Sequence, residues 1–207
     1  MDFAIELPQI SLTEPTLKYP DPDLLLLYKQ LGGRELWLDE EINWETCAFL
    51  VEYIQYLNHM EDDFLTPITI HIMSPGGELP VMFTIYDTIK KSRIPVVTIN
   101  EGACHSAAFI VFLAGKYREM NPHATFIAHE GSGAMGGSYR ENKAAMEQYE
   151  KDVAEMRHII AAETGIDEGL ITKKFEESQD WYIRYDEAVE KGILRPRPSI
   201  PTERPNT

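Results

Sequence analysis

The sequence is poor in cysteine and in cationic side chains, and each shortage excludes a class of protein. Its 207 residues include only two cysteines, Cys47 and Cys104, which is too few for a disulfide framework and favours a reducing compartment. Lys and Arg number 19 against 34 Asp and Glu, so the formal net charge is −15. An acidic chain lacks the clustered cations that bind nucleic acid or anionic membranes without sequence preference, and we expect neither partner.

Long apolar runs and nucleotide-binding loops are also missing. Residues 1–6 show neither the basic region nor the apolar stretch of a signal peptide, and the apolar run at 24–27 is too short to span a bilayer. These features predict a cytoplasmic protein. No Gly-Lys-Ser/Thr phosphate-binding loop occurs, so any ATP chemistry would have to come from a partner.

What the sequence does contain is an alternation of strand-like and helix-like segments. Hydrophobic residues make up 43% of the chain, enough for one substantial core. Repeated strand–helix units predict a single α/β domain with a mostly parallel sheet. The expected strands are 35–38, 68–72, 96–99 and 125–128. Expected helices begin at 44, with Asn43 as the cap, and at 79 and 106. A long helix follows the capping-box pair Ser138 and Glu141 and ends at Gly165, and shorter helices begin at 167 and 186.

Both ends of the chain differ in composition from this middle part. Residues 1–31 begin with a stretch rich in Pro and polar residues and predict an extended N-terminal arm. Residues 196–207 contain four prolines, a density that no regular element tolerates, so we expect a disordered tail there.

Three short motifs stand out between the two ends. They are Ser-Pro-Gly-Gly at 74–77, Gly-Ala-Cys-His-Ser-Ala-Ala at 102–108 and Phe-Ile-Ala-His at 126–129, each ending an expected strand or opening an expected helix. Together they offer a serine hydroxyl, an imidazole and backbone amides next to glycine. Acyl transfer needs these parts: a nucleophile, a base and donors for an oxyanion.

Each motif also has a purely structural interpretation. Ser-Pro-Gly-Gly can be no more than a tight turn, Ser106 can be a helix cap, and His129 can be an ordinary residue at a strand end. In the catalytic interpretation, Ser106 lies at a strand-to-helix corner as nucleophile and His129 is its general base. The amides of Gly77 and Ala107 would then bind the oxyanion.

A metal site is a weaker alternative. His105, His123 and Cys104 are close in sequence, but their spacing matches no standard metal site and no paired carboxylate accompanies them. We therefore expect neither a metal nor a cofactor.

In order and spacing the three motifs resemble those of the ClpP family, the proteolytic subunits of the Clp energy-dependent proteases. The resemblance covers about residues 32–195. It implies a ClpP/crotonase-like fold, a single α/β domain with a protruding handle helix at about 130–163. Three further segments carry it: Gly-Arg-Glu-Leu-Trp-Leu at 33–38, Ile-Tyr-Asp-Thr-Ile at 85–89 and Glu-Ala-Val-Glu-Lys-Gly-Ile at 187–193.

The resemblance also implies roles for single residues. The family's catalytic serine, histidine and aspartate fall on Ser106, His129 and Asp180, and its oxyanion amides fall on Gly77 and Ala107. The assignment of Asp180 depends on placing a small insertion within residues 176–179.

The implied activity is that of a serine endopeptidase that hydrolyses unfolded proteins inside a closed chamber. The resemblance implies a homo-oligomer, a heptameric ring stacked in pairs into a tetradecamer. It also implies a partner AAA+ unfoldase that supplies ATP hydrolysis, in keeping with the missing phosphate-binding loop.

Several residues depart from the family pattern and leave alternatives open. Met73 replaces an asparagine, Cys104 and His105 replace small residues before the serine, and Glu130 begins a replacement of Gln-Pro after the histidine. The chain could therefore be a catalytically inactive structural subunit of a mixed ring. A crotonase-type acyl-CoA enzyme is the third interpretation, because that superfamily shares the general fold and the paired amides.

Overall fold

The computed structural model describes residues 32–60, 65–131, 136–177 and 180–198. The expected arm at 1–31 and the expected tail from 199 onward lie outside these residues. The chain divides into two compact units, Met1–Gly33 and Arg34–Thr207. All the strands and helices named below belong to the second unit.

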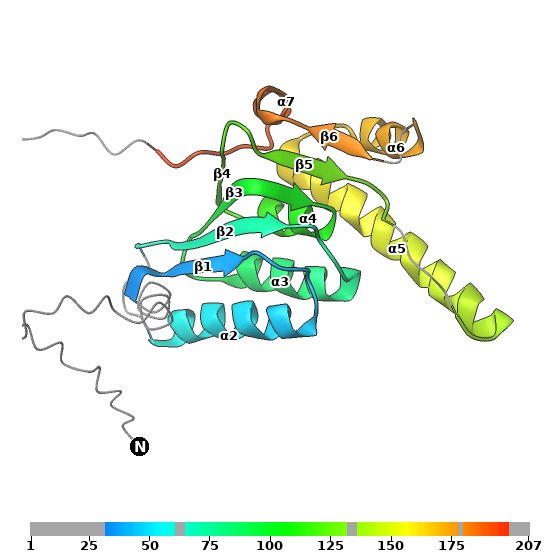
Figure 1. The fold of residues 1–207 in the computed structure, drawn as a ribbon, viewed down its shortest axis with the longest axis horizontal. Helices are drawn as coiled ribbons and strands as arrows, with labels where there is room; N and C mark the ends of the chain where they lie inside the picture. Colours follow the sequence, from blue (N-terminus) through cyan, green and yellow to red (C-terminus); the bar gives the residue numbers. More distant parts are fainter. Residues whose placement is uncertain (1–31, 61–64, 132–135, 178–179, 199–207) are drawn as a thin grey trace, which may run out of the picture. The chain divides into compact units, whose positions relative to one another are not determined.

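Six strands of the described residues form one sheet in the order β1-β2-β3-β5-β6, with β4 paired to β3 (Figure 1). Every pairing is parallel except that of β5 with β6. The expected α/β fold with a mostly parallel sheet is therefore confirmed. The strands are β1 (Glu35–Leu38), β2 (Ile68–Ser74), β3 (Val96–His105), β4 (Tyr117–Met120), β5 (Thr125–Ala128) and β6 (Trp181–Ile183).

Sequence patterns missed two strands and the length of a third. β3 continues to His105 because its first half pairs with β4 and its last three residues pair with β5. β4 has the sequence Tyr-Arg-Glu-Met and buries the charged side chain of Arg118. It therefore lacks the alternating apolar residues by which a strand is predicted from sequence. β6 has three residues, which is too short for a periodic pattern.

The helices begin and end at the expected signals. Asn43 Oδ1 accepts hydrogen bonds of 2.9 and 3.1 Å from two amides of the first turn of α2. Ser138 and Glu141 form a reciprocal capping box at the start of α5, and Gly165 ends α5 with a φ of 80°. The helices are α2 (Trp44–Met60), α3 (Leu79–Lys91), α4 (Ala107–Leu113), α5 (Tyr139–Thr164), α6 (Glu168–Glu177) and α7 (Tyr185–Glu190).

The core lies between the sheet and the helices α2, α3 and α4, which run along one side of it (Figure 1). In β2 the isoleucines at 68, 70 and 72 are fully buried, while the alternate side chains face the more open side. All seven residues of α4 are buried, and the ring of Phe112 packs 4.8 Å from that of Phe126. Burial of each such side chain stabilises the fold by about 1.5–3 kcal/mol, so the start of α4 is held firmly.

The longest helix, α5, is buried only in its second half. Its 26 residues span about 39 Å, and the buried side chains begin at Val153. The first half extends away from the sheet (Figure 1). None of the helices formed by the described residues is long and apolar enough to cross a membrane.

Candidate active site

The turn after β2 is shaped by a serine that is itself buried. Ser74 Oγ donates a 2.6 Å hydrogen bond to the carbonyl of Glu40 and accepts one of 3.2 Å from the amide of Gly76. Gly76 has a φ of +98°, and a Cβ added there would lie 2.7 Å from Ser106 Cβ. The turn can approach the Ser106 corner this closely only because position 76 has no side chain.

Gly77 meets a second stretch of backbone at equally short range. Ile42 donates a 2.8 Å hydrogen bond to the carbonyl of Gly76, and Glu78 donates one of 2.9 Å to the carbonyl of Ile42. A Cβ added to Gly77 would lie 2.1 Å from the Ile42 carbonyl oxygen. These two hydrogen bonds involve the carbonyl of Gly76 and the amide of Glu78, and the Gly77 amide takes no part in them.

Ser106 lies at the corner between β3 and α4 in a rare backbone conformation, with φ 54° and ψ −125°. A residue with a side chain adopts this conformation only at an energetic cost that the surrounding fold must offset. Its amide donates a 2.7 Å hydrogen bond to Ile127 in β5, and its carbonyl accepts one of 3.0 Å from Phe109. Its side chain makes no capping bond to α4, so the interpretation of Ser106 as a simple helix cap is not supported.

Two amides beside Ser106 are candidates for oxyanion binding. The Gly77 amide belongs to the turn after β2, and the Ala107 amide opens α4, where the helix dipole favours negative charge. Neither amide donates any of the hydrogen bonds that join turns and loops among the described residues. Free amides at a helix start and a glycine turn are suited to stabilise a developing oxyanion.

His129 follows β5 and contacts Asp180. Its Nδ1 lies 3.2 Å from Asp180 Oδ1, with the two side chains 22% and 38% exposed. The contact follows from strand register: Ala128 pairs with Trp181 in the antiparallel pair of β5 and β6, so the next two residues outward meet. Register thus selects Asp180 among the acidic residues near the expected insertion.

The segment after His129 is tied to α5. Tyr149 donates a 2.6 Å hydrogen bond to the Glu130 carbonyl, and Arg157 forms a 2.8 Å ion pair with the Glu130 carboxylate. Sequence analysis identified Glu130 only as a departure and missed both partners, since their spacing from it carries no motif. Glu130, one of the departures from the family pattern, is therefore held by two residues of α5.

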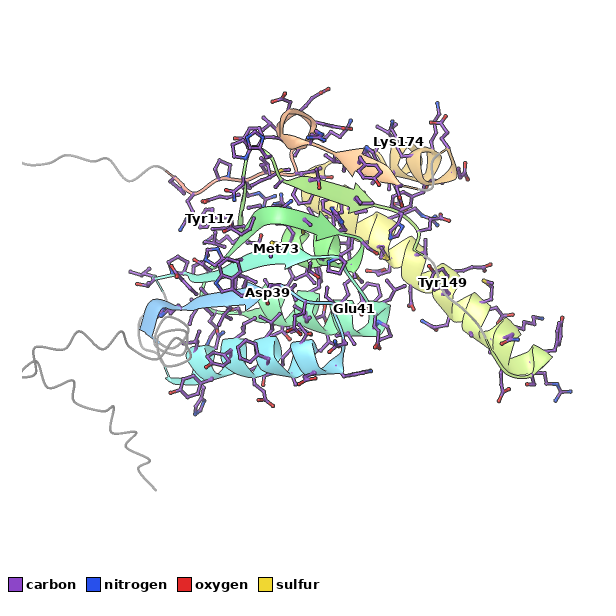
Figure 2. The ribbon with its side chains drawn as sticks, in the orientation of Figure 1. Asp39, Glu41, Met73, Tyr117, Tyr149 and Lys174 are labelled. Carbon is purple, nitrogen blue, oxygen red and sulfur yellow. The ribbon has the colours of Figure 1, made fainter. Side chains whose placement is uncertain are left out.

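The other departures lie beside the corner. Burial lowers the pKa of His105; the charge of Asp180 opposes this effect and the charge of His129 reinforces it. Nε2 of His105 lies 3.1 Å from Thr125 Oγ1. Cys104 is fully buried, and burial raises the pKa of its thiol. Met73, labelled in Figure 2, is 48% exposed and alternates along β2 with the buried isoleucines.

Ser106, His129 and Gly77 line one cleft of about 850 Å³. Residues of α5 form its far wall, among them Met146 and Tyr149, the second labelled in Figure 2. Asp180 contacts His129 and is not among the lining residues. The described residues contain no cluster of three His, Cys, Asp or Glu side chains placed to hold a metal ion.

Comparison with known proteins identifies the family of the chain. The family model of the Clp protease matches residues 24–195. The chain belongs to the Clp protease family. It is 32% identical to the ATP-dependent Clp protease proteolytic subunit 2 of Treponema denticola, over 83% of this chain and 85% of that protein.

Other members of the Clp protease family show comparable similarity. The proteolytic subunit 3 of a Synechococcus strain is 29% identical, over 86% of this chain and 88% of that protein. A solved structure of a ClpP1 mutant from Listeria monocytogenes superposes with a TM-score of 0.71 at 26% identity, covering 82% of this chain and 93% of that one. The ClpP-like fold expected from the sequence is thereby confirmed, and the chain is a divergent member of the family.

Proposed function

We propose that this Clp protease subunit is a serine endopeptidase with Ser106, His129 and Asp180 as its triad. The observation that carries the proposal is that His129 contacts Asp180 and lines the same cleft as Ser106, which lies at its strained corner. Nucleophile, base and orienting carboxylate come from three separate elements of the sheet, and geometry of this kind defines a triad whatever the order in the chain.

The proposed mechanism gives each ring nitrogen of His129 a role. Because Nδ1 faces Asp180, the carboxylate holds the proton on Nδ1 and leaves Nε2 as the acceptor for the Ser106 proton. Ser106 Oγ then attacks the peptide carbonyl, and the imidazolium is stabilised by Asp180. His129 returns the proton to the leaving amine, and water hydrolyses the acyl-enzyme.

The amides of Gly77 and Ala107 complete the proposal. As the carbonyl becomes tetrahedral, its oxygen gains charge that two preorganised amides can bind without reorganisation. A side chain at position 77 is excluded by the Ile42 backbone, so the site depends on glycine there. Loss of one such donor typically reduces turnover by about 100- to 1000-fold.

The proposed assembly is a heptameric ring, stacked into a tetradecamer that encloses the active sites in the cytoplasm. The projecting half of α5, at positions 139–152 largely exposed apart from Asn142, Tyr149 and Asp152, would be the handle through which two rings stack. An AAA+ unfoldase would thread unfolded proteins into the chamber, since the chain lacks a phosphate-binding loop of its own. Sedimentation at a large multiple of 23.7 kDa is expected, and a strict monomer at micromolar concentration would contradict the ring.

Labelling by a fluorophosphonate, read by intact mass, tests the triad. Wild-type protein should gain one adduct and Ser106→Ala none. Ser138→Ala is the matched control, because Ser138 also begins a helix but lies in a capping box, and it should be labelled like the wild type. An assembled wild-type ring that takes no label would instead identify the chain as an inactive structural subunit of a mixed ring.

A further inference from the structure

The charge of the cleft suggests which peptides it accepts. Three carboxylates line it, those of Glu41, Glu78 and Asp152, while no Lys or Arg side chain does. The remaining lining is largely apolar or uncharged, and His129 belongs to the catalytic centre. An extended peptide bound next to Ser106 would therefore meet a concave surface of one sign of charge.

Two of these carboxylates belong to residues whose backbone is held beside the proposed oxyanion amide of Gly77. Ile42, which follows Glu41, bridges to Gly77 and is bound on both sides by the hydrogen bonds of 2.8 and 2.9 Å described above. Glu78 follows Gly77 directly and is the N-cap residue of α3, yet its side chain makes no capping bond. Both carboxylates are exposed and remain available to a ligand at the reacting carbonyl.

The third carboxylate comes from the opposite wall. Asp152 lies on α5, where Gln148 donates a 2.8 Å hydrogen bond to its Oδ1. Tyr149 lines the same wall. Figure 2 labels Glu41 and, on α5, Tyr149, which lies three residues before Asp152; Glu41 and Asp152 both line the cleft.

None of these three carboxylates forms an ion pair with any residue that the structure describes. Elsewhere on the surface the carboxylates of Asp87, Glu147 and Glu177 pair with a Lys four residues away. Arg157 on α5 pairs with Glu130, the residue that follows His129. Unpaired charges of one sign in a concave site focus the field and attract a ligand of the opposite sign.

We infer that this cleft prefers peptide segments with Lys or Arg side chains next to the bond that is cut. The inference rests on the proposed peptidase function and names the substrate class for the same site. Long cationic side chains can place an aliphatic stem against the apolar lining and an ammonium or guanidinium group against a carboxylate. Acidic peptides meet repulsion at the same positions.

Cleavage of matched fluorogenic peptides that differ only in the residue before the cut tests the preference. With assembled protein at low salt, kcat/KM should fall in the order Lys or Arg, then Leu, then Glu. Because exposed ion pairs are worth little individually, Glu41→Gln, Glu78→Gln and Asp152→Asn should each reduce kcat/KM for the Lys peptide by about two- to fivefold. The loss should be smaller for the Leu peptide than for the Lys peptide, and high salt should reduce the difference between peptides.

Glu147→Gln is the control for charge, since Glu147 lies on α5 but pairs with Lys143 and does not line the cleft. It should leave both peptides unchanged. Equal rates for Lys and Glu peptides, or equal losses for Lys and Leu peptides in the three variants, would overturn the inference.

Binding separates this inference from the proposed activity. Fluorescence anisotropy on Ser106→Ala protein measures the affinity for the Lys and Glu peptides without any cleavage. A wild-type protein that neither cleaves nor takes the fluorophosphonate would refute the peptidase proposal. If its Ser106→Ala form still binds the Lys peptide more tightly, the charge preference of the cleft stands on its own.

Discussion

Two ion pairs in this fold contrast sharply in their surroundings. Arg118 is fully buried and Glu163 is 11% exposed, and the Arg118 guanidinium also donates to the carbonyls of Glu163, Leu113 and Gly192. Lys90 and Tyr86 complete the cluster, at 2.6 and 2.9 Å from the Glu163 carboxylate. By contrast, the pair of His129 and Asp180 lies at the edge of the cleft and is partly exposed.

The contrast separates charges that hold the fold from charges to which we assign a role in catalysis. The Arg118 cluster ties α3, α4, α5 and β4 to the C-terminal segment, and its charges are compensated from several sides. Burial raises the pKa of Glu163, but hydrogen bonds from Lys90 and Tyr86 and the charges of Lys90 and Arg118 outweigh it, so the pKa lies below its usual range. In the His129 pair only Nδ1 of the ring faces the carboxylate, and in the proposed mechanism the other ring nitrogen accepts the Ser106 proton.

The largest expected effect is on activity alone. Asp180→Asn preserves the shape of the side chain but no longer holds the proton on His129 Nδ1, so kcat should fall by about 10⁴-fold. The melting temperature should change little, because Asp180 is 38% exposed. Peptide turnover and thermal melting of the same preparation measure both quantities. A variant that melted much earlier would show instead that this pair supports the fold.

The opposite result is expected at the buried cluster. Glu163→Ala leaves the Arg118 charge without its carboxylate, which should lower the free energy of unfolding by about 3 kcal/mol. Asp87→Ala removes an exposed carboxylate paired with Lys91 and should cost less than about 1 kcal/mol. Urea unfolding of both variants measures the two losses of unfolding free energy. Similar losses would show that burial does not distinguish the two ion pairs.

Replacing both charges of the cluster sharpens the comparison. Because a buried pair gains little over apolar packing, the double variant Arg118→Met with Glu163→Leu should lose less stability than Glu163→Ala alone. If the loss of unfolding free energy in the double variant equals the sum of the losses of Arg118→Met and Glu163→Leu alone, the two charges act independently.

A smaller effect on stability is expected at the glycine turn. A methyl group at Gly77 would collide with the Ile42 carbonyl, so Gly77→Ala should cost about 1–3 kcal/mol of stability and displace an oxyanion amide. Gly136→Ala is the matched control, since a Cβ there meets nothing within 4 Å. If the Gly77 amide is an oxyanion donor, fluorophosphonate labelling should be reduced in Gly77→Ala and normal in Gly136→Ala. Normal labelling in both would exclude the Gly77 amide from the site.

The smallest effect is a dependence on pH. Since the folded-state pKa of Glu163 is lowered, its contribution to stability is present above the unfolded pKa and is lost as pH falls through the folded pKa. Melting curves from pH 7 down to about 3, around and below the ordinary pKa of a glutamate, should therefore show a smaller acid-induced decrease for Glu163→Gln than for the wild type. Equal slopes would show that other carboxylates account for the acid sensitivity.

Sequence patterns predicted those elements whose signals are local. The start of α2 at Asn43, the capping box of α5 and the stop at Gly165 each depend on neighbouring residues, and the structure confirms them. β4 and β6 went unpredicted because their positions depend on pairing with distant strands. Arg118, fully buried in β4, is the clearest case, since a charge enters the core only where distant partners compensate it.

The sequence alone, through the order and spacing of its motifs, indicated the Clp protease family. The same motifs also gave the candidates Ser106 and His129. Only the tertiary structure decided that Asp180 meets His129, because register in the pair of β5 and β6 sets that contact. Likewise only the fold assembled Glu41, Glu78 and Asp152 into one acidic cleft. Local sequence encodes turns, caps and periodicity, whereas a cleft forms where segments distant in the chain are packed together by a shared core.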